Sequence, residues 1–168
     1  DDLVRGSLDG TLPDSVQCVY ISPIKALAND IEKNLLGPLG EIKERYLPSR
    51  AKEIQVGLRT GDTPQSERQK MLRKPTHILI TTPESLGLGL ASKRFRPILD
   101  QMKWFIIDEM HSLVPTKRGT HLSLSMALMD TVVSSDVQRI GISATMEPLD
   151  AVAEFLVASD SRETDAKP

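Results

Sequence analysis

The sequence lacks the features that stabilise very small domains or anchor a chain in a membrane. Its 168 residues include one cysteine, Cys18, which cannot form an internal disulfide, so a reducing compartment is expected. No apolar run approaches the ~18 residues of a membrane span. The acidic start, with Asp1, Asp2 and Asp9, does not resemble the basic and apolar regions of a secretory signal. These absences exclude a disulfide scaffold and a spanning segment, and they favour a cytoplasmic location.

Aromatic residues and net charge are also scarce. Aromatics make up 4% of the chain, so platforms on which nucleic-acid bases could stack are few, and the net charge is −2. The charge is unevenly spread, because residues 25–99 hold 14 Lys and Arg against 8 Asp and Glu. This pattern permits a positive face on a nearly neutral protein, but scattered solvated charges explain it as well.

Apolar and charged contents of 39% and 26% are typical of a globular domain. Residues 1–15 are expected to be a loop or the end of a truncated element, residues 16–158 a folded domain, and residues 159–168 a polar tail. Within the domain, short apolar runs predict strands, and longer runs of helical periodicity alternate with them. The predicted strands are 16–22, 54–58, 77–80, 104–107 and 139–142, and the main predicted helices are 26–36, 41–46, 63–72, 85–91, 119–133 and 148–157.

The predicted helix ends depend on proline and on capping residues. Gly37 and Pro38 are expected to end the helix over 26–36. Thr63 and Thr82 each precede a proline, which predicts an N-cap followed by proline at the first helical position.

Five repeats of strand and helix, with strands that are apolar throughout, predict an α/β fold with a mainly parallel sheet covered on both faces. The carboxyl ends of parallel strands lie along one edge, where function gathers. Small, polar or charged residues follow every predicted strand: Ser22-Pro23, Arg59-Thr60-Gly61, Thr81-Thr82-Pro83, Asp108-Glu109 and Ser143-Ala144-Thr145.

Asp108 and Glu109 directly follow an apolar strand. A carboxylate in this position can hold Mg²⁺ together with waters and phosphates, and the second carboxylate can orient or deprotonate an attacking water. A solvated acidic loop or a helix cap is the alternative. His111 follows at a spacing that favours a functional role, whereas the three histidines have no cysteine partners or zinc spacing.

The remaining strand ends carry weaker indications. Thr82 and Thr81 stand at a predicted helix start, where free N–H groups favour a phosphate, although a simple cap explains them equally well. Lys25 follows a strand end and could meet a phosphate. Ser143 and Thr145 offer two hydroxyls that could link two sites.

Taken in order, these segments resemble motifs Ia, Ib, Ic, II and III of superfamily 2 helicases of the DExH type. Within that group the chain is most similar to the large helicase-related (Lhr) proteins. The resemblance covers residues 16–156 and is carried by Tyr20-Ile21-Ser22-Pro23-Ile24-Lys25-Ala26-Leu27, Arg59-Thr60-Gly61-Asp62, Thr81-Thr82-Pro83-Glu84, Asp108-Glu109-Met110-His111, Thr116-Lys117-Arg118-Gly119 and Ser143-Ala144-Thr145.

The resemblance implies a RecA-like domain of three layers, the first of two in an ATP-dependent nucleic-acid translocase with ATP and Mg²⁺ as cofactors. Asp108 would hold Mg²⁺ through water, and Glu109 would activate the hydrolytic water. His111 would couple nucleotide state to the nucleic acid together with Ser143, Ala144 and Thr145. The nucleic-acid backbone, of single-stranded or partly duplex DNA, would lie against Pro23, Lys25, Arg59, Thr60, Gly61, Thr81, Thr82, Pro83 and Glu84.

The sequence departs from the family in one respect, since none of its ten glycines is followed by lysine and the phosphate-binding Walker A loop is therefore not among these residues. We interpret the chain as a fragment, incomplete at the N-terminus and without the second RecA-like domain, that is inactive alone. An RNA-acting DExH helicase, a degenerate non-catalytic nucleic-acid-binding module and an unrelated α/β fold are the alternatives.

Overall fold

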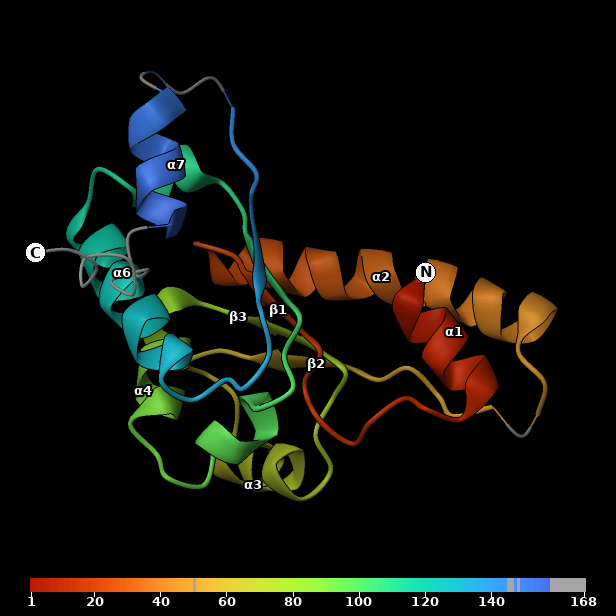
Figure 1. Ribbon diagram of the computed structural model, residues 1–168. Helices are drawn as coiled ribbons and strands as arrows, with labels where there is room; N and C mark the ends of the chain where they lie inside the picture. Colours follow the sequence, from red (N-terminus) through yellow and green to blue (C-terminus); the bar gives the residue numbers. More distant parts are fainter. Residues whose placement is uncertain (50, 145–146, 148, 158–168) are drawn as a thin grey trace, which may run out of the picture.

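A five-stranded sheet forms the centre of the structure (Figure 1). The computed structural model describes residues 1–49, 51–144, 147 and 149–157. The strands are β1 (Cys18–Ile21), β2 (Val56–Arg59), β3 (Ile78–Thr81), β4 (Trp104–Ile107) and β5 (Gln138–Gly141). They pair in the order β2-β3-β1-β4-β5, and all four pairings are parallel. The predicted parallel sheet is confirmed, and its five carboxyl ends share one edge.

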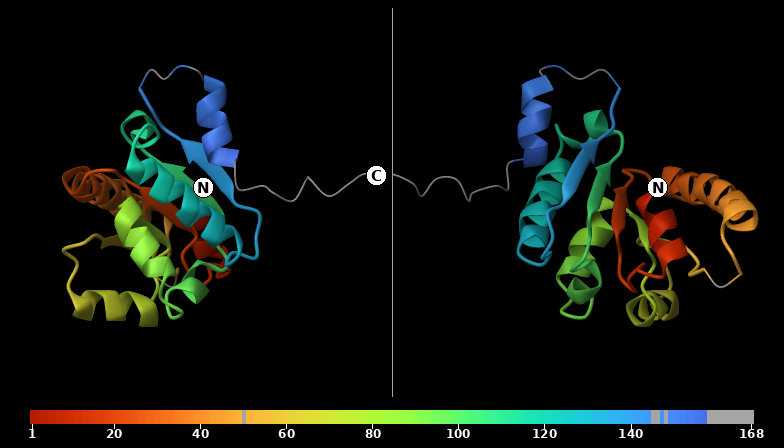
Figure 2. Two further views of the ribbon diagram at one scale, coloured as in Figure 1. Left: turned by 90° about the vertical axis from the view of Figure 1, so that its left-hand side faces the viewer. Right: turned by 45° about the vertical axis from the view of Figure 1, so that its right-hand side comes forward.

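Helices cover both faces of this sheet. They are α1 (Asp2–Asp9), α2 (Lys25–Tyr46), α3 (Gln65–Arg73), α4 (Pro83–Leu90), the 3₁₀ helix η1 (Arg96–Leu99), α5 (Met110–Leu113), α6 (Lys117–Asp130) and α7 (Leu149–Val157). The right-hand view of Figure 2 shows the strands between α6 and α7 on one side and α1 and α2 on the other. Helices α4 and α6 pack against each other, and α2 contacts β2 and β3. The structure thus has the predicted three layers.

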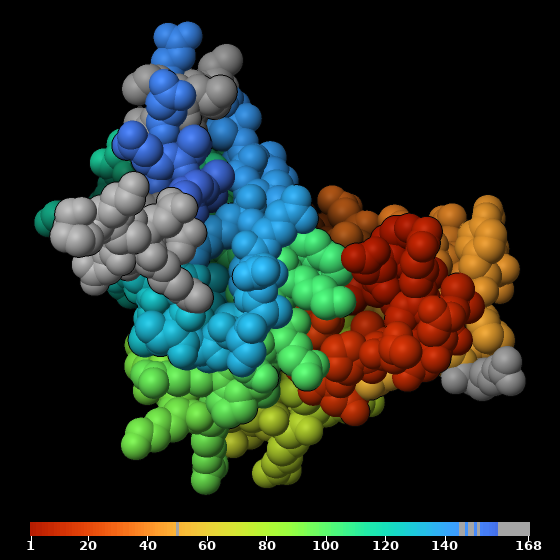
Figure 3. All heavy atoms as spheres, viewed as in Figure 1, coloured from red at the N-terminus to blue at the C-terminus, as the bar shows by residue number. Residues whose placement is uncertain are grey.

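The two faces of the sheet differ in burial. Phe105 and Ile107 of β4 are completely buried against the α4–α6 side, whereas Trp104 and Ile106 on the opposite face are half-buried. Figure 3 shows a notch in the surface. On one side of it lie β5 and α7 (blue), and on the other side lie α1 and α2 (red and orange). Both faces are covered, as the sequence predicted, and the core is concentrated on one of them.

Helix α2 runs without a break over 22 residues, so the predicted end at Gly37-Pro38 is wrong. Proline costs the helix one backbone hydrogen bond and crowds the preceding turn, which a helix can accommodate by bending when the chain around it is free to adjust. A Cβ placed on Gly37 or Gly40 would have no atoms within 4 Å, so nothing beside the proline opposes that adjustment. The helix lies along the outside of the molecule (Figure 1).

The capping predictions had different outcomes. Thr82 caps α4 as predicted, because its hydroxyl accepts from the Ser85 amide at 3.4 Å. Thr63 does not cap α3; its hydroxyl accepts from the Thr60 amide at 2.8 Å and so closes the preceding turn.

Several elements differ from the prediction, and among them α1 is an amphipathic helix that ends at Gly10 in the left-handed conformation. Residues 2–9 form α1 where a loop or the end of an element was expected, and η1 and α5 are short elements without their own periodicity.

Thr145, Met146, Pro148 and the predicted tail 159–168 lie outside the described residues. No described helix has both the length and the apolar content needed to cross a bilayer.

Candidate functional site

The carboxylate of Asp108 lies at the end of β4, between the ends of β1 and β5. Strand β4 pairs with β1 so that Tyr20 is opposite Ile106, which places the Tyr20 ring on the same face as Asp108 two residues later. The Tyr20 hydroxyl donates to Asp108 Oδ2 at 2.9 Å, and the Glu109 amide donates to Oδ1 at 2.9 Å. Burial and this hydrogen bond to Asp108 raise the pKa of Tyr20, so the phenol keeps its proton and remains a donor.

Glu109 has a backbone conformation that is unusual for a residue with a side chain. Its φ and ψ of 51° and 44° lie in the left-handed region, and no other non-glycine residue in the described part of the chain has a positive φ. Such a conformation costs roughly 1–3 kcal/mol and persists where the surroundings enforce it, often at functional sites. Here it turns the chain sharply from β4 into α5.

His111 connects the end of β4 to the end of β5. Its Nε2 lies 3.2 Å from Glu109 Oε2, and its Nδ1 lies 3.3 Å from the Ser143 hydroxyl. The His111 amide also donates to that hydroxyl at 3.2 Å. In the neutral ring with its proton on Nε2, imidazole donates to Glu109 and accepts from Ser143, which satisfies all three groups together. Ala144 follows in an exposed position.

The end of β1 places Pro23 and Lys25 at the start of α2. Ser22 is buried, and its hydroxyl donates to the Ile24 carbonyl at 3.2 Å. Lys25 Nζ forms an exposed ion pair with Asp62 at 2.7 Å, so the segments that follow β1 and β2 lie side by side at this edge.

At the end of β2 the predicted cation turns inward. Arg59 is 7% exposed, and its guanidinium lies 4.4 Å from the centroid of the Phe95 ring. Burial, with a smaller contribution from Arg68, lowers the pKa of Arg59. A guanidinium over an aromatic face is a favourable way to bury a cation. Arg59 therefore supports the loop beneath the surface instead of facing solvent.

The loop after β2 is held by a second arginine. Arg68 of α3 donates to the Thr60 carbonyl at 3.1 Å and to the Gly61 carbonyl at 2.9 Å. Thr60 itself is buried. The loop therefore has a fixed backbone, with the Thr60 side chain buried and the Asp62 side chain exposed.

The end of β3 is buried in the same way. The Thr81 hydroxyl donates to the Arg59 carbonyl at 2.7 Å, and Thr82 and Pro83 are buried at the start of α4. Glu84 is the exposed member of this segment, and both of its carboxylate oxygens accept from Arg118, at 2.5 and 3.1 Å. This pairing lowers the pKa of Glu84.

The predicted residues thus form two groups along one edge. The acidic cluster comprises Tyr20, Asp108, Glu109, His111 and Ser143. The β1–β3 edge comprises residues 22–25, 59–62 and 81–84. The free positive face that the charge distribution permits does not form here, because Lys25 pairs with Asp62, Arg59 is buried and Arg118 pairs with Glu84.

Sequence reasoning assigned no role to Tyr20 or Arg118, although both stand in the segments that carry the resemblance. The alternation of side chains along parallel strands gives a signal for Tyr20, because it places that ring beside the carboxylate after the neighbouring strand. Arg118 has no comparable signal, since its partners lie 34 and 95 residues away in the sequence.

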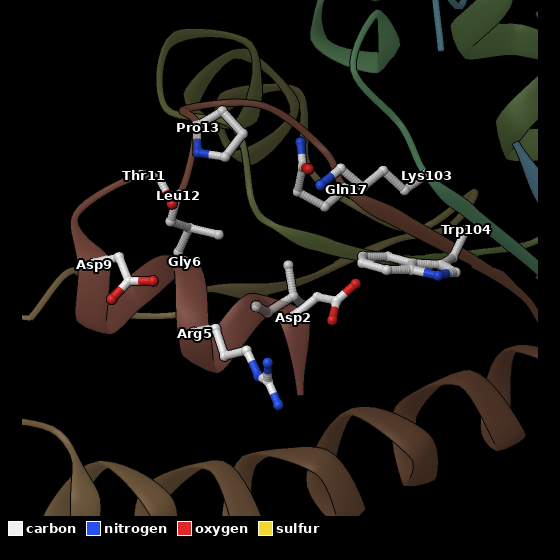
Figure 4. Close-up of a pocket in the computed structure, with 11 residues that line it drawn as sticks. Asp2, Arg5, Gly6, Asp9, Thr11, Leu12, Pro13, Gln17, Lys103 and Trp104 are labelled. Atoms are coloured by element: carbon white, nitrogen blue, oxygen red, sulfur yellow. The ribbon is translucent and has the colours of Figure 1, made fainter. Parts of the chain in front are cut away.

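A surface hollow of about 250 Å³ lies at the opposite end of the sheet (Figure 4). It is bounded by α1 and by the residues that precede and begin β1 and β4, including Gln17 and the Trp104 indole. Because these strands start here, the hollow is remote from the acidic cluster and contains none of its residues.

Comparisons with known proteins agree with this arrangement. The DEAD/DEAH box helicase family matches residues 4–153. The chain is 52% identical over 157 residues to the ATP-dependent helicase Lhr-Core of Methanothermobacter thermautotrophicus, covering 93% of this chain and 18% of the relative. It is 48% identical over 140 residues to the Lhr helicase/uracil glycosylase of Escherichia coli, covering 82% of this chain and 9% of the relative. The chain therefore spans less than a fifth of either curated relative.

The fold also matches solved structures. The helicase Lhr of Mycobacterium smegmatis, bound to ssDNA and AMP-PNP, superposes with a TM-score of 0.78 at 47% identity, covering 86% of this chain and 19% of that one. The DEAD-box helicase Mss116, bound to ssRNA and UDP-BeF, is 20% identical with a TM-score of 0.72, which supports the fold alone.

Proposed function

The chain belongs to the DEAD/DEAH box helicase family, and from that premise we propose that it is part of the ATP-dependent motor of a helicase that moves on DNA. The contacts that join Asp108 and Glu109 to Ser143 carry this proposal, because they link an acidic pair suited to phosphate chemistry to a second strand end. The similarity to Lhr helicases, one of them bound to ssDNA, supports DNA as the polymer.

The residues present fit Mg²⁺ bound mainly through water. No group of three or more His, Cys, Asp and Glu side chains suited to a metal occurs among the described residues. Mg²⁺ commonly uses one or two carboxylates and takes its other ligands from waters and nucleotide phosphates. Each oxygen of Asp108 accepts one protein hydrogen bond and keeps a free lone pair. Bound there, Mg²⁺ would neutralise charge on the ATP phosphates.

We assign Glu109 as the base that takes a proton from the attacking water. Its Oε2 faces His111, which leaves Oε1 available to accept that proton. The left-handed backbone fixes the direction of the side chain. In this scheme His111 senses the charge of Glu109, and its contact with Ser143 transmits the change to the segment containing Ala144 and Thr145.

We assign the nucleic-acid backbone to the β1–β3 edge. Its loops are fixed, and many of its side chains turn inward, so amides, carbonyl groups and the exposed Lys25 would meet the polymer more than buried side chains would. Arg59, Thr60, Thr81 and Thr82 would then act by holding these loops. Gly61 and Glu84 complete the surface, and the buried Pro23 and Pro83 would shape the backbone beneath it. Contacts of this kind position a backbone and carry no base sequence information.

We further propose that residues 16–158 are part of the first RecA-like domain and that a second such domain is its partner. The 168-residue chain contains no glycine followed by lysine. We therefore expect it to hydrolyse no ATP by itself.

The test is ATP hydrolysis by the 168-residue chain and by a longer protein that extends it into the native reading frame at both ends. Each is assayed alone, with single-stranded DNA and with single-stranded RNA. Strong stimulation of the longer protein by DNA is expected. Stimulation by RNA but not by DNA would mean that the protein acts on RNA. Nucleic-acid binding by the longer protein without ATP hydrolysis would favour a non-catalytic module.

A further inference from the structure

Arg118 joins two strand ends that are far apart in the sequence. Its guanidinium donates to the Pro23 carbonyl after β1 at 2.7 Å. The same group donates to both oxygens of Glu84 at the start of α4, at 2.5 and 3.1 Å. Both segments belong to the β1–β3 edge, assigned above to the nucleic-acid backbone: Lys25 is exposed there, and the buried Thr82 holds its loop.

The position of Arg118 is unfavourable within its own helix, and its favourable contacts are the distant ones. It lies in the first turn of α6, where the helix dipole favours acidic residues. The pairing nevertheless raises the pKa of Arg118 and lowers that of Glu84, as expected for a pair that stabilises both charges. A planar guanidinium matches a carboxylate with two parallel hydrogen bonds, which fixes orientation as well as distance.

The backbone of Arg118 is held in place relative to the acidic cluster. A side chain on Gly119 would collide with the Leu113 carbonyl, so glycine permits the first turn of α6 to approach the end of α5 closely. The Thr116 hydroxyl also donates to the Leu113 carbonyl at 2.7 Å. Because α5 begins directly after Glu109 and contains His111, Arg118 extends from a helix, α6, that packs against the element containing His111.

We propose that Arg118 is a positioning residue that sets the spacing between residues 22–25 and residues 82–84. A polymer backbone presents phosphates at regular intervals, so two segments that bind it must keep a fixed separation. The guanidinium provides that separation by holding a carbonyl group of one segment and a carboxylate of the other. That the ligand is a nucleic acid rests on the proposed function. The contacts from Arg118 to Pro23 and Glu84, here called the Arg118 clamp, exist in the protein without a ligand.

Lys117 provides a matched control, because it is the exposed neighbour of Arg118 and carries the same charge. In the longer protein, R118Q is expected to weaken binding of a fluorescent single-stranded oligonucleotide by about tenfold more than K117Q does, from lost coupling of the two segments. Glu84→Gln, which keeps the contact with Pro23, and Arg118→Lys, which keeps the charge, should give intermediate losses.

Hydrogen exchange without nucleic acid tests the clamp separately. R118Q should speed exchange of the amides in residues 22–26 and 82–86, with K117Q unchanged, while thermal unfolding confirms that both variants fold. If R118Q unfolds, Arg118→Lys supplies the same comparison. Equal exchange in the R118Q and K117Q proteins would overturn the clamp. Failure of the unsubstituted protein to bind DNA would overturn the proposed ligand but leave the exchange result to decide on Arg118.

Discussion

The acidic cluster and the β1–β3 edge occupy the same edge of one sheet, but they are held in different ways. Glu109, His111 and Ser143 expose their side chains and are joined by contacts between side chains. Thr81 and Thr82 bury theirs and use them to fix the backbone. In the function proposed above, the difference separates two tasks: the first group would present reactive groups to a ligand, whereas the second would present a surface of fixed shape.

This difference predicts two kinds of response to substitution. An exposed side chain with few packing contacts is removed at little cost in folding free energy, so its loss affects the chemistry. A buried hydroxyl that satisfies a backbone group leaves an unpaired partner when it is removed, which costs about 1–3 kcal/mol. Substitutions in the acidic cluster should therefore change rates, and those at the β1–β3 edge should first change stability.

The largest expected effect is on hydrolysis. Glu109→Gln in the longer protein should slow DNA-stimulated ATP hydrolysis by roughly 10²–10⁴-fold, the contribution typical of a general base. Thermal unfolding and oligonucleotide binding should be nearly unchanged, because the amide has the same shape. The measurement is a steady-state ATPase assay beside fluorescence anisotropy.

Glu154 on α7 provides the control for that result, since it is an exposed carboxylate away from the cluster. Glu154→Gln should leave hydrolysis unchanged. Normal hydrolysis by the Glu109→Gln protein would remove the role assigned to Glu109 and, with it, the contrast between the two regions.

The next largest effect is on the free energy of unfolding, and it comes from a core position beside the ring that supports Arg59. A side chain on Gly89 would lie 2.7 Å from the buried Phe95 ring, which carries Arg59 on its face. Gly89→Ala should destabilise the protein by about 1–3 kcal/mol through overpacking. Gly40→Ala in exposed α2 meets no atom within 4 Å, and it should instead stabilise by about 0.5–1 kcal/mol. Denaturant unfolding of both variants measures the difference, and equal shifts would contradict it.

A smaller loss is expected at the start of α4. Thr82→Ala removes the hydroxyl that accepts from the Ser85 amide and should cost about 1 kcal/mol, the usual value of an N-cap. Thr120→Ala in the exposed first turns of α6 is the control, and alanine should be neutral or slightly stabilising there. Equal unfolding midpoints for the two variants would show that Thr82 does not hold this segment.

Local sequence signals were sufficient for the sheet and for most of the acidic cluster. Strands β1, β3 and β4 are short, largely apolar runs followed by polar residues, and the parallel arrangement places Asp108 near Ser143 because β4 and β5 are neighbours. The sequence therefore predicted that Asp108, Glu109, His111 and Ser143 share one edge of the sheet, whereas Tyr20 was missed and the chemistry of the cluster stays a prediction.

The β1–β3 edge was predicted less well because its side chains are decided by distant partners. The inward turn of Arg59 depends on Phe95, which follows it by 36 positions, and nothing near Arg59 in the sequence distinguishes a buried arginine from an exposed one. Thr63 looked like a helix cap but closes a turn to Thr60, because the loop geometry offers it a closer amide. Propensity identifies these residue types, whereas packing selects their partners.

The smallest expected effect is on the pH dependence of stability, through the Glu84–Arg118 ion pair. Pairing with Arg118 lowers the pKa of Glu84 in the folded protein, so its stabilising contribution is complete above the pKa of the unfolded chain, near 4.3, and is lost as the pH falls through the lower folded value. Because the Glu84 side chain is 51% exposed, solvent screening limits the contribution to roughly 0.2–1 kcal/mol. Unfolding midpoints of the unsubstituted chain and Glu84→Gln, compared between pH 6 and pH 3, should differ at pH 6 and converge toward pH 3. A constant difference over this range would mean that the pair adds no charge-dependent stability, and that Arg118 holds this edge through the Pro23 carbonyl alone.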